Sequence, residues 1–235
     1  MTELLFRDDA YLTSCEAKVV GVNERGGILL DRTVFYATGG GQPGDSGRLT
    51  WDGGSVAIAT AVKGETMDEV VHVPAEGETA PPVGATVTAE IDWDQRFSHM
   101  RVHTALHLLS AVLTFPVTGG QVSAGKGRLD FDMPELPISK EEIGEKLNAL
   151  VAADHPVTPT WITDDELAAQ PDLVKTMSVK PPAGAGRVRL IEVEGCDLQP
   201  CGGTHVRRTG EIGALSVGKI EKKGRQNRRV SILLG

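Results

Sequence analysis

Four residues that commonly bind metal ions form two spaced pairs, and they are the part of this sequence best suited to chemistry. His103 and His107 stand four positions apart, and Cys201 and His205 repeat that spacing about a hundred positions later. Imidazole nitrogens and a thiolate make a tetrahedral donor set that favours zinc over hard cations such as magnesium. The four side chains together predict one Zn2+ site. Each pair alone has an ordinary explanation, as two unrelated helix histidines or as a buried thiol beside a turn.

The first pair reaches one metal ion only if it lies on a helix. Apolar residues recur with helical spacing over residues 94–115, and Pro116 ends the pattern. His103 and His107 are then expected on one face, with their Cα atoms about 6 Å apart along the axis. Glu does not follow His103, so the metalloprotease pattern with its general base is absent.

The second pair is expected on a turn. Pro200 precedes Cys201, and two glycines, Gly202 and Gly203, separate it from Thr204 and His205. Glycine lets the backbone bend tightly, so that the thiolate and the imidazole converge.

Two domains are expected to position these pairs. Residues 1–95 carry short apolar runs separated by Gly, Asn and Asp, which is typical of strands in a small barrel. Residues 96–235 mix helical and strand-like patterns, with capping-box sequences at residues 139–142 and 163–166. We therefore predict an α+β fold, with an N-terminal β-barrel-like domain (1–95) followed by an α+β domain of antiparallel strands and helices (96–235).

Composition indicates a globular protein of a reducing compartment. Of the 235 residues, 40% are hydrophobic and 24% charged, and no apolar run approaches the roughly 20 residues that would span a membrane. The cysteines number three, which argues against a disulfide framework. The first residues lack the pattern of a secretory signal. We expect a cytoplasmic protein without a membrane partner.

The net charge of −8 is unevenly distributed. Residues 1–95 carry 6 Lys and Arg against 16 Asp and Glu, whereas residues 96–235 carry 18 against 16. A local basic segment can bind phosphates whatever the total charge. The alternative is a solvated surface. The basic segment of this chain is residues 222–229. Its predicted RNA contacts are Lys222, Lys223, Arg225, Arg228 and Arg229.

The motifs resemble a known family. The histidine pair followed by Pro-Cys-Gly-Gly-Thr-His, ending at His205, is similar to the editing domain of alanyl-tRNA synthetases and of free-standing alanyl-tRNA editing proteins. The stretches 35–47 and 204–213 are also similar to that family, which shares its second additional domain with threonyl-tRNA synthetases. The resemblance implies a zinc-dependent deacylase acting on mischarged tRNA(Ala) without ATP. Seryl-tRNA(Ala) is the principal substrate implied, with glycyl-tRNA(Ala) as a further candidate.

Ester hydrolysis leaves two roles open for the metal. Zinc can lower the pKa of a bound water toward about 7, or it can polarise and orient the aminoacyl end. Four protein ligands are typical of a closed structural site, whereas a catalytic site keeps one position open. The sequence does not choose between these roles for a site made by His103, His107, Cys201 and His205.

Discrimination of serine from alanine requires a buried polar group that pairs with the serine hydroxyl. Thr104, Gln121 and Ser123 are the candidates, and their ordinary alternatives are a solvent-facing helix residue and two turn formers. The synthetase form often has a polar residue just before the second histidine, but here that position is Leu106.

The glycine-rich stretch 39–47 supplies two further candidates. Its backbone at Gly41 is predicted to lie beside the acceptor end, and Asp45 is predicted to orient a ligand histidine. The alternative is a turn that packs one domain on the other. The stretch lacks both common phosphate-loop patterns.

Three other functions compete with this interpretation. A complete synthetase is disfavoured by the length of the chain. A non-enzymatic, zinc-stabilised tRNA-binding module is compatible with the basic segment and four ligands. Editing of threonyl-tRNA synthetase errors would use similar pairs, but the Pro-Cys-Gly-Gly-Thr-His segment favours the alanine system.

Overall fold

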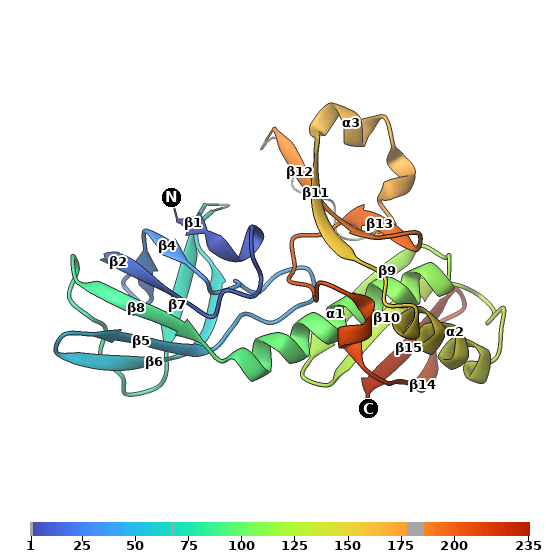
Figure 1. Cartoon of the computed structure of the whole chain (residues 1–235), viewed down its shortest axis with the longest axis horizontal. Coiled ribbons are helices and arrows are strands. Elements are labelled where there is room, and N and C mark those ends of the chain that lie inside the picture. The colour runs from blue at the N-terminus through green and yellow to red at the C-terminus, as the bar shows by residue number, and fades with distance from the viewer. Residues whose placement is uncertain (1, 67, 178–185) are drawn as a thin grey trace. The chain divides into compact units, whose positions relative to one another are not determined.

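A computed structural model describes residues 2–66, 68–177 and 186–235. The chain divides into two compact units, residues 1–97 and 98–235, and the long helix α1 (Trp93–Val112) crosses the division (Figure 1). The fold is α+β with mostly antiparallel strands, as predicted. Within the described ranges, no helix has the length and apolarity needed to cross a membrane.

The first unit is built on a closed six-stranded barrel, which confirms the prediction of a small barrel. The strands follow the order β2-β3-β7-β6-β5-β8 around it. Their bounds are β2 (Ser14–Val22), β3 (Ile28–Leu30), β5 (Gly47–Trp51), β6 (Gly54–Lys63), β7 (Val70–Pro74) and β8 (Thr86–Ile91). Beside the barrel, β1 (Glu3–Leu4) pairs in parallel with β4 (Arg32–Thr33), and the 3-10 helix η1 (Leu5–Arg7) follows β1.

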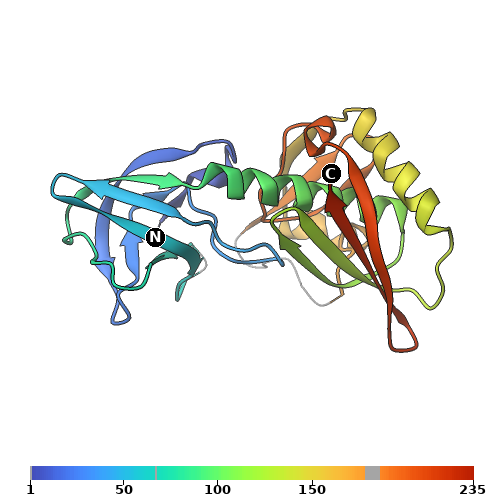
Figure 2. The ribbon, with the colours of Figure 1, turned by 90° about the horizontal axis from the view of Figure 1, so that it is seen from below.

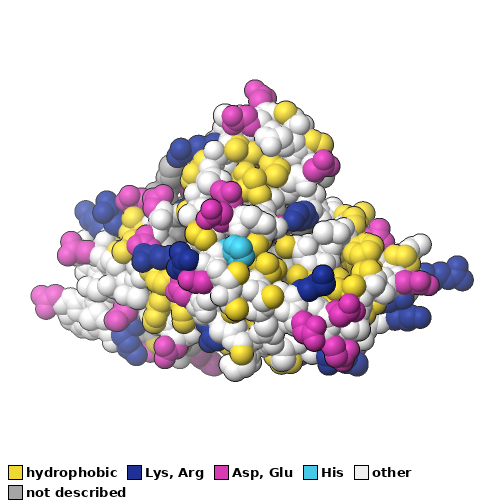
Figure 3. Space-filling model, turned by 45° about the vertical axis from the view of Figure 1, so that its right-hand side comes forward, with side chains coloured by type: hydrophobic (Ala, Val, Ile, Leu, Met, Phe, Trp, Pro, Cys, Tyr) yellow, Lys and Arg dark blue, Asp and Glu magenta, His cyan; other side chains and the backbone are white. Residues whose placement is uncertain are grey.

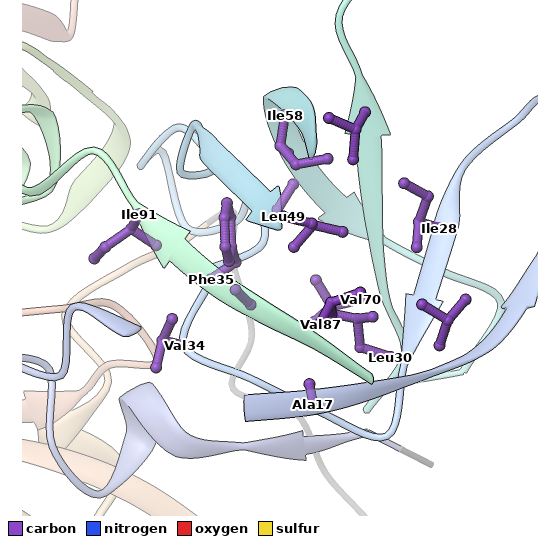
Figure 4. Packing of buried hydrophobic residues seen from close by; sticks show 14 of the residues in the cluster. Ala17, Ile28, Leu30, Val34, Phe35, Leu49, Ile58, Val70, Val87 and Ile91 are labelled. Atoms are coloured by element: carbon purple, nitrogen blue, oxygen red, sulfur yellow. The ribbon is translucent and has the colours of Figure 1, made fainter. Parts of the chain in front are cut away.

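Alternating side chains fill the barrel. Along β8, Val87, Ala89 and Ile91 are buried while the residues between them are exposed. Figure 4 shows apolar side chains from several strands converging on one core, with Val87, Ile91 and Phe35 among them. Strand β4 ends at Thr33, and the buried residues after it follow an irregular path.

In the second unit, α1 packs against a four-stranded antiparallel sheet of order β14-β15-β10-β9 (Figure 2). A Cβ at Gly127 would lie 2.6 Å from the Val102 side chain, so glycine is needed where the sheet meets the helix. The strand bounds are β9 (Val117–Ser123), β10 (Lys126–Asp132), β14 (Leu215–Lys223) and β15 (Asn227–Leu234). The strand β9 replaces the turn expected around Gln121.

A second, three-stranded antiparallel sheet has the order β11-β12-β13. Both predicted capping boxes are present, with Ser139 at the start of α2 (Lys140–Ala152) and Thr163 at the start of α3 (Asp164–Ala168). The remaining bounds are β11 (Val157–Thr163), β12 (Arg187–Val193), β13 (Asp197–Pro200), and the 3-10 helices η2 (Pro171–Leu173) and η3 (Thr209–Ile212).

Candidate metal centre

The four predicted ligand residues converge in the second unit. The candidate donor atoms of His103, His107, Cys201 and His205 all lie within 4.8 Å of one another. The Cys201 Sγ is 3.5 Å from His103 Nε2 and 3.3 Å from His205 Nε2. A tetrahedral site with bonds of about 2.0–2.3 Å has edges of about 3.3–3.7 Å, so these separations suit one bound ion. The three histidines are buried, which limits competition from water.

Backbone contacts hold the turn that carries the second pair. The Arg189 guanidinium donates from Nη1 to the carbonyl oxygens of Cys201 and Gly203, both at 2.9 Å. The Cys201 amide in turn donates to the Arg189 carbonyl at 3.1 Å. The Gly203 amide points at the Cys201 sulfur, 3.5 Å away. One arginine on β12 therefore fixes the start of the turn, and an N–H group faces the thiolate.

A threonine fixes the orientation of His205. The Thr104 hydroxyl donates to the Met100 carbonyl at 2.9 Å, so it accepts from His205 Nδ1 at 3.1 Å and from the Val206 amide at 3.3 Å. A proton on Nδ1 leaves the lone pair of His205 Nε2 for a metal. Thr104 is fully buried and the hydroxyl uses its one donor and two acceptor positions. This corrects both expectations for Thr104: it is neither solvent-facing nor able to pair with a serine hydroxyl.

A buried carboxylate fixes the orientation of His107. Asp197 Oδ2 accepts from His107 Nδ1 at 2.8 Å and from Gln199 Nε2 at 2.7 Å. Its other oxygen pairs with the Lys175 ammonium group, and Gln199 Nε2 also reaches Ser110 Oγ at 3.1 Å. The Nε2 atom of His107 is thereby directed at the cluster. Sequence reasoning missed these partners.

Burial and mutual charge shift the pKa values of the cluster. Burial lowers the pKa of His107, but hydrogen bonds to Asp197 and Cys201 outweigh it and raise the pKa to about 9. Burial raises the pKa of Asp197, yet its bond to His107 helps to hold it at about 2. Burial also opposes ionisation of Cys201, but His103 and His205 hold the pKa of the thiol well below its usual range. Burial, with the charge of His103, lowers the pKa of His205 to about 3. The Cys201 thiolate and the neutral His205 imidazole are in the ionisation states that metal binding requires.

Gln121 and Ser123 lie on the wrong face of the sheet for the role predicted for them. Between them, Val122 is buried and pairs in register with Gly127, which packs against α1. Side chains alternate along a strand, so the two polar residues face away from that helix. Both are exposed, and Gln121 Oε1 accepts from Arg128 Nε at 3.1 Å. The prediction that they contact substrate beside the metal is therefore corrected.

The prediction that Asp45 orients a ligand histidine is also corrected, because Asp45 has a different partner. Its carboxylate oxygens each accept from Arg96 Nε at 3.0 Å, and Oδ2 accepts from the Tyr36 amide at 2.6 Å. Asp45 and Arg96 are fully buried in the first unit. The carboxylate that orients a ligand histidine is Asp197, and Asp45 stabilises its own domain.

Gly41 lies at an exposed two-residue turn. Gly39 and Gln42 exchange both backbone hydrogen bonds, at 3.1 and 2.9 Å. Gly40 and Gly41 have φ of 57° and 82°, values that favour glycine in such a turn. Its contact with the acceptor end stays a prediction.

The basic segment separates into three kinds of residue. Arg228 is buried and donates to the carbonyls of Pro134 and Asn227, so its prediction as an RNA contact is corrected. Arg229 is paired with both carboxylate oxygens of Asp130, at 2.7 and 2.8 Å. On the face shown in Figure 3, acidic and basic side chains are interspersed. The exposed basic residues near the β14–β15 turn, here called the hairpin-tip cluster, are Lys222, Lys223 and Arg225.

Known proteins are similar in sequence to this chain over its full length. The threonyl and alanyl tRNA synthetase second additional domain matches residues 188–231, and the class II (A) tRNA synthetases match residues 10–95. The chain is 34% identical to the alanyl-tRNA editing protein AlaX-M of Methanosarcina acetivorans, over 100% of this chain and 99% of the relative. It is 33% identical to the AlaX-M protein of Saccharolobus solfataricus, over 98% of both. The alanine–tRNA ligase of Pyrobaculum neutrophilum is 37% identical over 94% of this chain but only 25% of the ligase. The chain therefore belongs to the family of AlaX-M alanyl-tRNA editing proteins.

Proposed function

We propose that this protein is a trans-editing hydrolase that removes the wrong amino acid from mischarged tRNA(Ala). Seryl-tRNA(Ala) is its main substrate and glycyl-tRNA(Ala) a second. The observation that carries the proposal is the convergence of three imidazoles and a thiolate within 4.8 Å, in a chain whose full-length relatives are named alanyl-tRNA editing proteins. Ester hydrolysis needs no ATP, and we place the activity in the cytoplasm, where tRNA is charged.

Zinc is the metal that suits this site. His103, His107, Cys201 and His205 offer three nitrogens and one sulfur, the mixed set that zinc accepts in tetrahedral geometry. When bound, zinc supplies Lewis-acid chemistry, either to a water molecule or to the ester carbonyl. The four residues hold the ion, and both roles remain compatible with the proposal.

The chain's own residues prepare the site before substrate arrives. Thr104 and Asp197 each accept a hydrogen bond donated from Nδ1, of His205 and His107 respectively, which directs both Nε2 atoms at the cluster. Arg189 fixes the turn around Cys201 through two carbonyl oxygens. Fixed partners of this kind keep the ligands oriented, so that binding the ion and the substrate requires little rearrangement.

The recognition of serine is assigned to a group other than Thr104, because that hydroxyl is already saturated by its three partners. A site that pairs with the serine hydroxyl disfavours alanine, because its polar group is left unpaired without one. The prediction that the backbone near Gly41 lies beside the acceptor end is retained as part of this proposal.

Binding of the tRNA backbone is assigned to the hairpin-tip cluster, whose three cationic side chains are exposed. Lys and Arg that neutralise phosphates release counterions, so this contribution weakens as salt rises. Arg228 is excluded from this surface by its burial.

The proposal is tested with purified protein on seryl-tRNA(Ala), glycyl-tRNA(Ala) and alanyl-tRNA(Ala), with zinc and after removal of zinc by a chelator. We expect rapid, zinc-dependent deacylation of the first, slower deacylation of the second, and an alanyl ester that is largely intact. Tight tRNA binding without deacylation of either mischarged tRNA would instead favour the non-enzymatic, zinc-stabilised binding module.

A further inference from the structure

A large aromatic side chain lies exposed near the metal centre. Trp161 on β11 is 39% exposed, although tryptophan side chains are usually well buried. The guanidinium carbon of Arg187 lies 5.0 Å from the centre of its ring, at a typical cation–π distance. The indole is thus held by a cation while part of its surface remains open to solvent.

Strand register connects this indole with the metal-binding turn. Trp161 is paired with Arg189 across β11 and β12, and the Arg189 carbonyl accepts from the Cys201 amide. The three residues form one row, in which Cys201 directly follows the last residue of β13. Neighbouring strands lie about 4.8 Å apart, so the Cα atoms of Trp161 and Cys201 are separated by about 10 Å along this row.

The indole also shares a sheet face with the partners of the metal cluster. Directly paired residues in antiparallel strands project to the same face, and so do alternate residues along one strand. Asp197 and Gln199 both contact His107. Asp197 is paired with Val193 on β12, and Gln199 is paired with Ile191. Val193, Ile191 and Arg189 are alternate residues of β12, so they project to one face. Trp161 therefore projects to the face that carries the site.

We infer that Trp161 is the stacking platform for the 3′-terminal adenosine of the tRNA. This inference rests on the proposed function, in which the ester joins the amino acid to the ribose of that nucleoside. A single ribose separates the adenine base from the aminoacyl ester. An adenine stacked on Trp161 can therefore place the ester toward Cys201. Aromatic side chains stack bases without hydrogen-bond readout, and the cation–π contact with Arg187 holds the indole in place.

The test compares binding of uncharged tRNA(Ala) with binding of the same tRNA trimmed of its 3′-terminal adenosine. Stacking contributes about 1–3 kcal/mol per base, so the wild-type protein should prefer intact tRNA by about 5- to 150-fold. Trp161→Ala should abolish this preference and Trp161→Phe should keep most of it. Leu233→Ala, which removes a similarly exposed apolar side chain from β15, should behave as wild type.

Zinc content should be unchanged in all three variants. If Trp161→Ala does not fold, Trp161→Leu takes its place, because leucine retains apolar bulk without an aromatic face. Trp161→Leu should then lose the preference for intact over trimmed tRNA. A wild-type protein without the preference, or a Trp161→Ala variant that retains it, would overturn the inference. The binding test uses uncharged tRNA, so its result does not depend on deacylation. An absence of hydrolysis in the deacylation assay would refute the proposed function, while a preference for intact tRNA that depends on Trp161 would still support the stacking platform.

Discussion

Replacing Asp197 with Asn perturbs the ligand His107 without touching the metal. The Asp197 carboxylate accepts from His107 Nδ1 at 2.8 Å, from Gln199 Nε2 at 2.7 Å, and from Lys175. An amide offers one oxygen and one NH2 group, so at least one of these donors would face another donor. Loss of such an outer partner costs 10- to 100-fold in metal affinity, which is about 1.4–2.8 kcal/mol of binding free energy.

The assay is competition for zinc between the protein and a chromogenic chelator at pH 7. Asp130→Asn is the matched control, because Asp130 is also ion-paired, with Arg229, but belongs to the outer side of the four-stranded sheet. The control should bind zinc as the wild type does. The reasoning is refuted if Asp197→Asn retains wild-type affinity, or if both substitutions weaken binding equally.

Three further predictions follow from the same contacts. Thr104→Val leaves the N–H groups of His205 and Val206 without their acceptor, so the free energy of unfolding should fall by about 1–3 kcal/mol. Denaturant titration checks this, Thr104→Ser should restore stability, and the preference for seryl over alanyl ester should persist in both. Alanine at all three positions of the hairpin-tip cluster should weaken tRNA binding. It should also reduce the slope of log binding constant against log salt concentration by about one for each phosphate that is no longer neutralised. Arg228→Ala should mainly lower the melting temperature, because Arg228 is buried. Equal effects of the two changes on both measurements would contradict this assignment. Zinc loading at pH 7 should release about one proton, because the pKa of His107 is raised to about 9 while the Cys201 thiol is already ionised. Calorimetry in two buffers of different ionisation enthalpy measures that proton, and heats independent of the buffer would count against it.

Local patterns predicted much of the fold. The apolar spacing around His103 and His107 and the capping box at Ser139 depend only on neighbouring residues, and both helices are present. Short apolar runs between turn residues likewise predicted the strands of the barrel. The four-residue cluster could be predicted because its residue types are rare in the chain and chemically specific.

Residues whose roles depend on strand register could not be placed in this way. The side of β9 that carries Gln121 is decided by the close approach of Gly127 to α1, and the burial of Arg228 by the contacts of β15. Asp197 lies 90 positions from His107, and only the pairing of β13 brings it there. One signal was present: Asp197 and Gln199 alternate with Cys201, as residues on one face of a strand do.

The central claim is that one zinc ion, held by His103, His107, Cys201 and His205, supports hydrolysis of the mischarged ester. Its most direct test is a zinc titration of metal-free protein during deacylation of seryl-tRNA(Ala). The rate should rise linearly to one equivalent of zinc and then stay constant, and a His205→Ala variant should show neither the rise nor tight zinc binding. Full activity in metal-free protein, or activity that is indifferent to zinc, would contradict the claim.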